Sequence, residues 1–223
     1  MYKLTILLLS CLALSVSAIS LCPNGCKFPH CYQDWMGYSP EISDVAVDYA
    51  TCSCVTNEYI DNIFSWFYDP CKKAQTKENV EDITLILSEK KLNLLAFIAY
   101  DKVRDWIVVS FRATVCGQFM SNVRLDLDFF QVDYGKHQCE NKRCKIHKGF
   151  KQGYENLVEY GGLISQLKKF LDKHPNSKVL VTGVSLGGAL ATIGAFDIAN
   201  TIPALNHNNE VMVYTYGGPR VGN

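Results

Sequence analysis

One serine in this sequence has the neighbours that a catalytic nucleophile needs. Ser185 is the centre of a G-x-S-x-G pattern, residues 183–187, in which the flanking glycines are Gly183 and Gly187. The apolar run 178–182 before it predicts a short buried strand, and the small apolar residues 186–200 after it predict a buried helix. A chain that turns this sharply from strand to helix strains the central residue and holds its hydroxyl clear of the sheet. We predict that Ser185 is a nucleophile; the alternative is a tight turn whose serine only caps the helix.

The start of the predicted helix supplies a partner for this serine. Backbone N–H groups and the positive end of the helix dipole lie there, and both stabilise a developing oxyanion. The Leu186 N–H is the first such donor. A serine also needs a general base, and after Ser185 the sequence offers Asp197 and His207. Asp197 falls within the helix and is predicted to be structural, while His207 lies in a polar loop and is predicted to be solvated.

The remaining elements must position this turn. Ser39-Pro40 predicts the start of a helix that runs to about residue 50, and strands are expected at 92–100, 106–111 and 123–132. Apolar residues at helical spacing predict one long helix at 149–173, and residues 211–216 predict a last strand. The order strand, helix, strand indicates an α/β fold with a parallel sheet and crossover helices.

The N-terminus predicts export. Lys3, the apolar run 4–14 and the small residues 16–18 are typical of a secretory signal peptide at 1–18. The alternative, a membrane anchor, needs about 20 apolar residues, and no stretch of the sequence is apolar enough. Lys plus Arg and Asp plus Glu are both 22, which argues against nucleic acid as a partner. We expect a secreted protein without a transmembrane segment.

Cysteine usage agrees with export. The sequence has 10 cysteines, and removing Cys11 with the signal leaves an odd number that disulfides cannot fully pair. Sequence alone does not fix the pairing, although Cys139 with Cys144 is the local prediction. Residues 19–38 form a Cys-rich segment for which a zinc cluster is the weaker alternative to disulfides. The globular domain is expected at 39–223.

Four ordered blocks between residues 108 and 223 resemble one known family, and the resemblance as a whole covers roughly residues 40–223. They are Val-Val-Ser-Phe-Arg-Ala-Thr at 108–114, Ile-His-Lys-Gly-Phe at 146–150, residues 181–191 around Ser185, and residues 215–223. The chain is similar in these blocks to the class 3 lipases, the fungal-type triacylglycerol lipases of the α/β-hydrolase fold. The resemblance implies that Ser185 is the nucleophile, that Leu186 and Thr114 form the oxyanion hole, and that His147 is structural. It implies no metal and no organic cofactor.

The same resemblance places a lid at 115–123, with Phe119 and Met120 on its apolar underside. Such a lid opens transiently at a lipid surface. The alternative for these two side chains is ordinary core packing.

The chain departs from the family pattern in three places. Ala113 replaces the usual glycine of F-R-G-[ST], and Val184 replaces the usual histidine before the nucleophile. In the family, the acid and the histidine of the triad follow the block that ends here at Asn223. We therefore expect the sequence to be a C-terminally incomplete member, with an incomplete fold.

Two functions follow from this resemblance. The first is a secreted carboxylic ester hydrolase that acts on acylglycerols through Ser185, or on other esters with the same nucleophile. The second is a secreted, catalytically inactive, lipase-like protein that binds lipid or a partner.

Overall fold

The computed structural model describes residues 17–18, 38–89, 92–114, 130–135, 144–206 and 211–223. Its centre is a six-stranded sheet with the strand order β1-β8-β7-β4-β3-β2. The strands of this sheet are β1 Ser17–Ala18, β2 Val80–Leu87, β3 Leu95–Asp101, β4 Trp106–Phe111, β7 Lys178–Val184 and β8 Val211–Tyr216. A separate pair consists of β5 Gln131–Asp133 and β6 Lys145–His147.

The sheet is parallel where the predicted strand-helix-strand unit lies. β4 pairs with β7, and β7 with β8, in parallel, whereas β2, β3 and β1 join in antiparallel pairings. The α/β-hydrolase fold with a parallel centre is therefore confirmed, with antiparallel strands at its edges.

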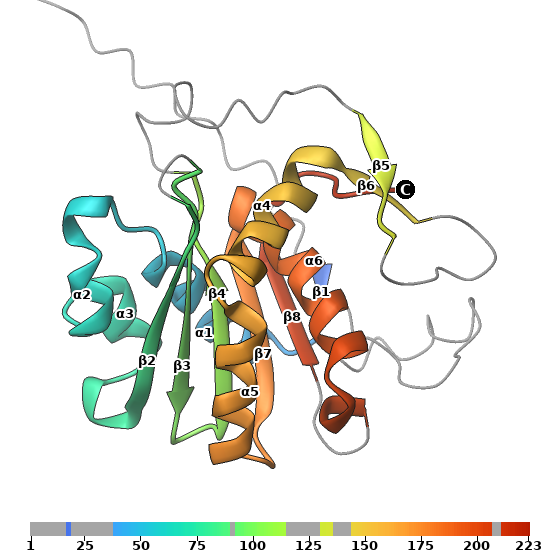
Figure 1. Ribbon diagram of the computed structural model, residues 1–223. Helices are drawn as coiled ribbons and strands as arrows, with labels where there is room; N and C mark the ends of the chain where they lie inside the picture. The colour runs from blue at the N-terminus through green and yellow to red at the C-terminus, as the bar shows by residue number, and fades with distance from the viewer. Residues whose placement is uncertain (1–16, 19–37, 90–91, 115–129, 136–143, 207–210) are drawn as a thin grey trace, which may run out of the picture.

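Helices cover both faces of the sheet. Figure 1 shows α4, α5 and α6 in front of the strands and α1 behind them. The helices are α1 Pro40–Cys52, α2 Asp61–Phe64, α3 Asp69–Ala74, α4 Lys148–Glu159, α5 Leu163–Lys173 and α6 Leu186–Thr201, with short 3-10 turns η3 Asn57–Tyr59, η4 Lys77–Asn79 and η5 Pro203–Asn206.

Alternation along the central strands divides the interior into two cores. In β4, Ile107 and Val109 face the core under α4, α5 and α6, while Val108 faces the core shared with α1 and α3. In β7, Val181 faces the core under α4, α5 and α6, and Leu180 faces the core shared with α1 and α3. A strand buried on both faces has to be apolar at nearly every position, which explains the continuous apolar runs in the sequence.

The predicted start of the first helix is confirmed. Ser39 Oγ accepts a hydrogen bond from the Ile42 N–H at 3.2 Å. Pro40 occupies the first helical position, where it costs no hydrogen bond.

A disulfide that the sequence did not single out, Cys52–Cys71, ties the end of α1 to α3. Cys144 is disulfide-bonded as well, but Cys139, its predicted partner, lies outside the described residues.

The prediction of one long helix at 149–173 is wrong. The structure has α4 and α5 there, interrupted at residues 160–162. Gly162 has φ 72°, and a Cβ at Gly161 would lie 2.7 Å from the Leu157 carbonyl oxygen and 2.9 Å from that of Leu87. The helical spacing of the apolar residues continues across this break, so the pattern concealed a turn that the two glycines make possible.

The other strand predictions have mixed outcomes. β8 coincides with the predicted strand, and β3 and β4 form the predicted pair, although β3 begins at Leu95. The strand expected at 123–132 falls largely outside the described residues, and its last residues enter β5. The predicted signal peptide and Cys-rich segment lie outside them almost entirely and stay predictions. No helix in the described ranges has both the length and the apolar character needed to cross a membrane.

Candidate active site

Ser185 lies at the junction of β7 and α6, at the carboxyl ends of the parallel strands. Its backbone has φ 55° and ψ -122°. Residues with a side chain rarely adopt this conformation. The Ser185 N–H donates to the Tyr216 carbonyl at the end of β8, at 2.9 Å, so the neighbouring strand holds the turn in place. The side chain is exposed, and the predicted strained turn is therefore present with its hydroxyl clear of the sheet.

Two glycines make this turn possible because backbone packs directly against them. A Cβ at Gly183 would lie 2.3 Å from the Gly187 carbonyl oxygen, and a Cβ at Gly187 would lie 2.2 Å from the Phe111 carbonyl oxygen. These distances are far shorter than van der Waals contact. The first contact closes the turn on itself, and the second fastens the start of α6 to the end of β4.

The first turn of α6 presents backbone donors beside Ser185. The amides of Gly188 and Ala189 both donate to the Ser185 carbonyl, at 2.9 Å and 3.2 Å. Leu186 precedes them as the first helical residue, where an N–H has no partner within the helix. Its apolar side chain is buried and holds the backbone in place. The oxyanion role predicted for the Leu186 N–H remains a prediction.

Thr114 lies on the loop that follows β4. Because Gly187 packs against Phe111, and its Cβ position is 3.0 Å from the carbonyl carbon of Arg112, this loop begins beside the Ser185 turn. Thr114 is half-buried, and its Oγ1 is buried without a hydrogen-bond partner among the described residues. A buried hydroxyl without a partner can donate a hydrogen bond, and an oxyanion donor needs this capacity.

The Arg112 side chain anchors the loop that carries Thr114. It is 3% exposed, and its guanidinium donates to the Val55 carbonyl at 3.2 Å, the Asn57 Oδ1 at 2.9 Å and the Asn93 carbonyl at 2.5 Å. Burial lowers the pKa of this guanidinium from its ordinary value, but an arginine stays charged at neutral pH. Arg112 had no role assigned from the sequence. A charged residue directly after the apolar end of a buried strand was the signal that could have revealed it.

Replacing Arg112 with methionine should therefore destabilise the fold by about 2 to 4 kcal/mol, because the buried Val55 carbonyl and the part-buried acceptors on Asn57 and Asn93 lose a charged donor. Urea unfolding measures this loss. Arg220→Met is the matched control, since Arg220 is exposed and donates only to the nearby Gly222 carbonyl among the described contacts. Equal midpoints for the two variants would contradict the anchoring role.

Asp197 and the two described histidines, His147 and His174, have contacts of their own. Asp197, in α6, is buried and accepts from the Tyr154 hydroxyl at 2.8 Å. Burial, followed by the charge of Asp197, raises the pKa of Tyr154 well above its usual value. The His147 ring stacks on Phe150, with ring centroids 4.3 Å apart, and the His174 ring stacks on Tyr100 at 3.6 Å. These contacts agree with the structural roles predicted for Asp197 and His147.

Several predicted features lie outside the described residues. They are His207 and the lid segment 115–123 with Phe119 and Met120. Of the two described departures from the family pattern, Ala113 is half-buried in the loop between Arg112 and Thr114, and Val184 packs against the core shared with α1. In the described part of the chain, no group of three or more His, Cys, Asp or Glu side chains could hold a metal ion.

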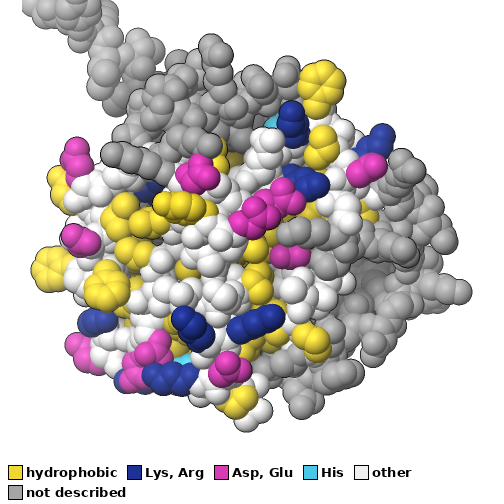
Figure 2. All heavy atoms as spheres, in the orientation of Figure 1, with side chains coloured by type: hydrophobic (Ala, Val, Ile, Leu, Met, Phe, Trp, Pro, Cys, Tyr) yellow, Lys and Arg dark blue, Asp and Glu magenta, His cyan; other side chains and the backbone are white. Residues whose placement is uncertain are grey.

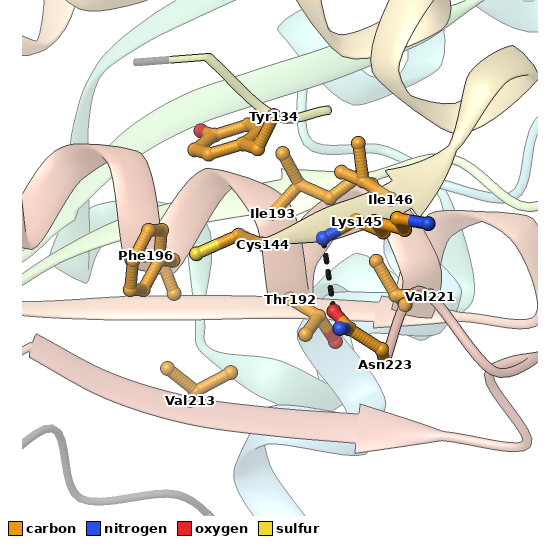
Figure 3. A pocket seen from close by; sticks show the side chains of 12 residues that line it. Tyr134, Cys144, Lys145, Ile146, Thr192, Ile193, Phe196, Val213, Val221 and Asn223 are labelled. Carbon is orange, nitrogen blue, oxygen red and sulfur yellow. Dashed lines mark hydrogen bonds between the residues drawn. The ribbon is translucent and has the colours of Figure 1, made fainter. Parts of the chain in front are cut away.

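A cavity of about 250 Å³ lies on the α6 side of the sheet, apart from Ser185. Figure 3 shows Ile193 and Phe196 of α6 directed toward it, with Tyr134 and Val213 on other sides. Asn223 closes one end, where its Oδ1 accepts from the Lys145 N–H at 2.9 Å. Ser185, Leu186 and Thr114 do not line this cavity, so it is not part of the candidate active site.

Comparison with known proteins places the described geometry in a family. Residues 108–223 match the family model described as Lipase (class 3). This match contains β4, the loop with Thr114, the Ser185 turn and β8. It begins after α1, α2 and α3.

Individual relatives agree with the family match. A lipase of Rhizopus niveus is 42% identical over 83 residues, which cover 37% of this chain and 20% of that protein. The secreted mono- and diacylglycerol lipase 1 of Fusarium solani is 32% identical over 134 residues, which cover 60% of this chain and 35% of that protein. The solved structure of Rhizomucor miehei triacylglyceride lipase superposes with a TM-score of 0.64 at 27% identity, covering 83% of this chain and 65% of that one. The chain thus spans less than two thirds of the length of these relatives.

Proposed function

Since the chain belongs to the class 3 lipase family, we propose that the whole protein is a secreted serine hydrolase that cleaves carboxylic esters of acylglycerols. The observation that carries the proposal is the backbone of Ser185, at φ 55° between β7 and α6. This conformation is strained, and a strained residue persists only where the surrounding structure enforces it. Gly183, Gly187 and the Tyr216 carbonyl enforce it here, and the result is an exposed hydroxyl beside the amides that begin α6.

In the proposed reaction, the Ser185 Oγ attacks the ester carbonyl carbon. The carbonyl oxygen becomes an oxyanion that accepts hydrogen bonds from the Leu186 N–H and from Thr114. The general base takes the Ser185 proton and returns it to the departing oxygen, so collapse of this intermediate releases the alcohol and leaves the acyl group on Ser185. Water activated by the same base then releases the fatty acid. The general base and the acid that orients it belong, in this proposal, to the part of the family's length that the present sequence does not span.

Other features support the wider proposal. The proposed substrate class, acylglycerols, is taken from the Fusarium relative, whose name describes it as a secreted mono- and diacylglycerol lipase. Residues 1–18 have the pattern of a secretory signal. The segment 115–123 follows the proposed oxyanion loop directly and is proposed as the lid, through which the protein would contact a lipid surface transiently.

A serine-reactive phosphonate tests the nucleophile directly. We expect the secreted full-length protein to take up one phosphonyl group, located on Ser185 by peptide mass spectrometry, with loss of p-nitrophenyl butyrate hydrolysis in the same proportion. Buried serines such as Ser110 serve as internal controls, because the reagent cannot reach them in the folded protein. Absence of label on Ser185 in folded protein would refute the proposal and favour the inactive, lipid-binding alternative.

A further inference from the structure

Buried hydroxyl groups join α1 to three neighbouring strands of the sheet. Each hydroxyl lies within hydrogen-bonding distance of a backbone carbonyl of α1: Tyr216 of β8 with Ser43 at 2.5 Å, Thr182 of β7 with Ala46 at 3.1 Å, and Ser110 of β4 with Tyr49 at 2.9 Å. Figure 2 shows the opposite face of the molecule, where charged side chains of both signs lie at the surface, whereas these hydroxyls are buried under α1. Hydrogen bonds are directional and apolar contacts are not, so the hydroxyls fix the position of α1 on the sheet.

The first turn of α1 reaches the backbone of Ser185 through Tyr216. Tyr216 is the last residue of β8, and its own backbone carbonyl accepts the Ser185 N–H at 2.9 Å. Its hydroxyl donates to the Ser43 carbonyl and lies 3.3 Å from the Ser43 Oγ. Burial raises the pKa of Tyr216 to about 12, so the hydroxyl keeps its proton and can donate at neutral pH. The start of α1 therefore fixes Tyr216, and Tyr216 fixes the Ser185 turn.

The other end of α1 reaches the loop that carries Thr114. Ser53, the residue that ends α1, is 0% exposed. Its Oγ lies between two carbonyl oxygens, 2.7 Å from that of Ala50 and 3.1 Å from that of Phe111. Phe111 is the last residue of β4, and its carbonyl is the group that packs against Gly187. Ser53 therefore holds the point from which the loop with Thr114 departs.

These two contacts act on the two parts of the proposed site that must keep a fixed spacing. An oxyanion that accepts from both the Leu186 N–H and Thr114 needs both donors in place, and a displacement of about 1 Å can cost about 10²-fold in rate. We propose that Tyr216 and Ser53 are positioning residues, through which α1 sets the distance between the Ser185 turn and the loop with Thr114. This inference rests on the proposed function. α1 itself lies before the stretch that matches the family model.

Two substitutions that remove only these hydroxyls test the inference. Tyr216→Phe and Ser53→Ala are made alone and together in the secreted full-length protein. kcat and KM are measured with p-nitrophenyl butyrate, and the enzyme is counted by phosphonate uptake at Ser185, so unfolded protein does not enter the comparison. We expect the double variant to lose about tenfold in kcat with KM within about twofold of the wild type, because the oxyanion forms only in the transition state.

Tyr49→Phe is the matched control. Tyr49 is also buried, and its hydroxyl donates to the buried Asp101 carboxylate at 2.8 Å. Asp101 pairs with Trp106 at the start of β4, whereas Phe111 ends that strand, so the bond lies at the opposite end of β4. The substitution leaves the Tyr49 carbonyl in place. It should lower the urea midpoint at least as much as Tyr216→Phe, since the lost acceptor is a carboxylate, and leave kcat unchanged.

The outcomes separate this inference from the hydrolase proposal. An active, labelled wild type whose kcat is unchanged in the double variant would overturn the inference alone. An equal loss of kcat in Tyr49→Phe would overturn it too, because the effect would then follow stability. A folded wild type that takes up no phosphonate would refute both proposals. If the double variant does not fold, Tyr216→Phe decides, since it removes one oxygen atom and keeps the ring; about threefold loss of kcat is expected from it alone.

Discussion

Ser185→Ala should reduce ester hydrolysis by about 10⁴-fold or more, because the substitution removes the only atom that attacks the ester in the proposed mechanism. Removing the nucleophile of a serine hydrolase costs as much as removing its whole triad, and the activity that remains comes from the oxyanion hole and binding. The measurement is kcat/KM for p-nitrophenyl butyrate, and for an emulsified triacylglycerol, with the secreted full-length protein.

The fold of the Ser185→Ala variant should be intact, since the Ser185 side chain is exposed and alanine keeps the Cβ. Ser165→Ala is a suitable control: Ser165 is also exposed, and its hydroxyl donates to the Gly162 carbonyl at 2.8 Å, far from the chemistry in sequence and on a different helix. Hydrolysis by the Ser185 variant within tenfold of the wild type would mean that another residue is the nucleophile.

Gly187→Ala should both unfold and inactivate the protein. The added methyl group would lie 2.2 Å from the Phe111 carbonyl oxygen and 2.9 Å from its carbonyl carbon, and neither atom can rotate away as a side chain does. Either α6 or the end of β4 has to move, and the loop with Thr114 moves with β4. We expect a loss of about 3 kcal/mol or more in the free energy of unfolding, which urea titration measures.

The neighbouring glycine provides the comparison. At Gly188 the same methyl group would lie 3.2 Å from the Gly183 carbonyl oxygen and 3.2 Å from the Gly218 Cα, which is tight but can be relieved by a small shift. Alanine also favours a helix over glycine by up to about 1 kcal/mol. Gly188→Ala should therefore change the free energy of unfolding by about 1 kcal/mol at most. A similar loss in both variants would show that the Phe111 contact has no special importance.

The sequence predicted the elements whose residues follow a regular pattern. α1 was recognised from Ser39 and Pro40, and β8 from its apolar run between polar segments. β2 was missed for a physical reason. Asp82 has φ 54°, and the pairing with β3 shifts register between Glu81 and Thr84. The strand therefore contains a bulge that interrupts the alternation of buried and exposed residues.

The candidate site was predicted in part. Ser185 and its two glycines were found because the turn is local, and a local turn leaves its signature in five consecutive residues. The contact of the Phe111 carbonyl with Gly187 depends on the parallel pairing of β4 with β7, whose residues are far apart in the sequence. The Arg112 side chain also reaches Val55 and Asn57, more than 50 residues earlier in the chain. Likewise, the Cys52–Cys71 disulfide could not be chosen from the many pairings that the cysteine count allows. These contacts are set by the three-dimensional fold.

The burial of α6 decides where new substrate preferences can be engineered. This helix contains buried residues from Leu186 to Ile198 and packs between β4, β7 and α4. A helix that is apolar on all sides in this way belongs to the interior. A library that randomises the positions of α6 would return mostly unfolded chains, because each replacement disturbs the packing of the buried helix that follows Ser185. For the proposed hydrolase, directed evolution should instead sample exposed positions outside α6, where side-chain size can change while the Ser185 turn keeps its shape.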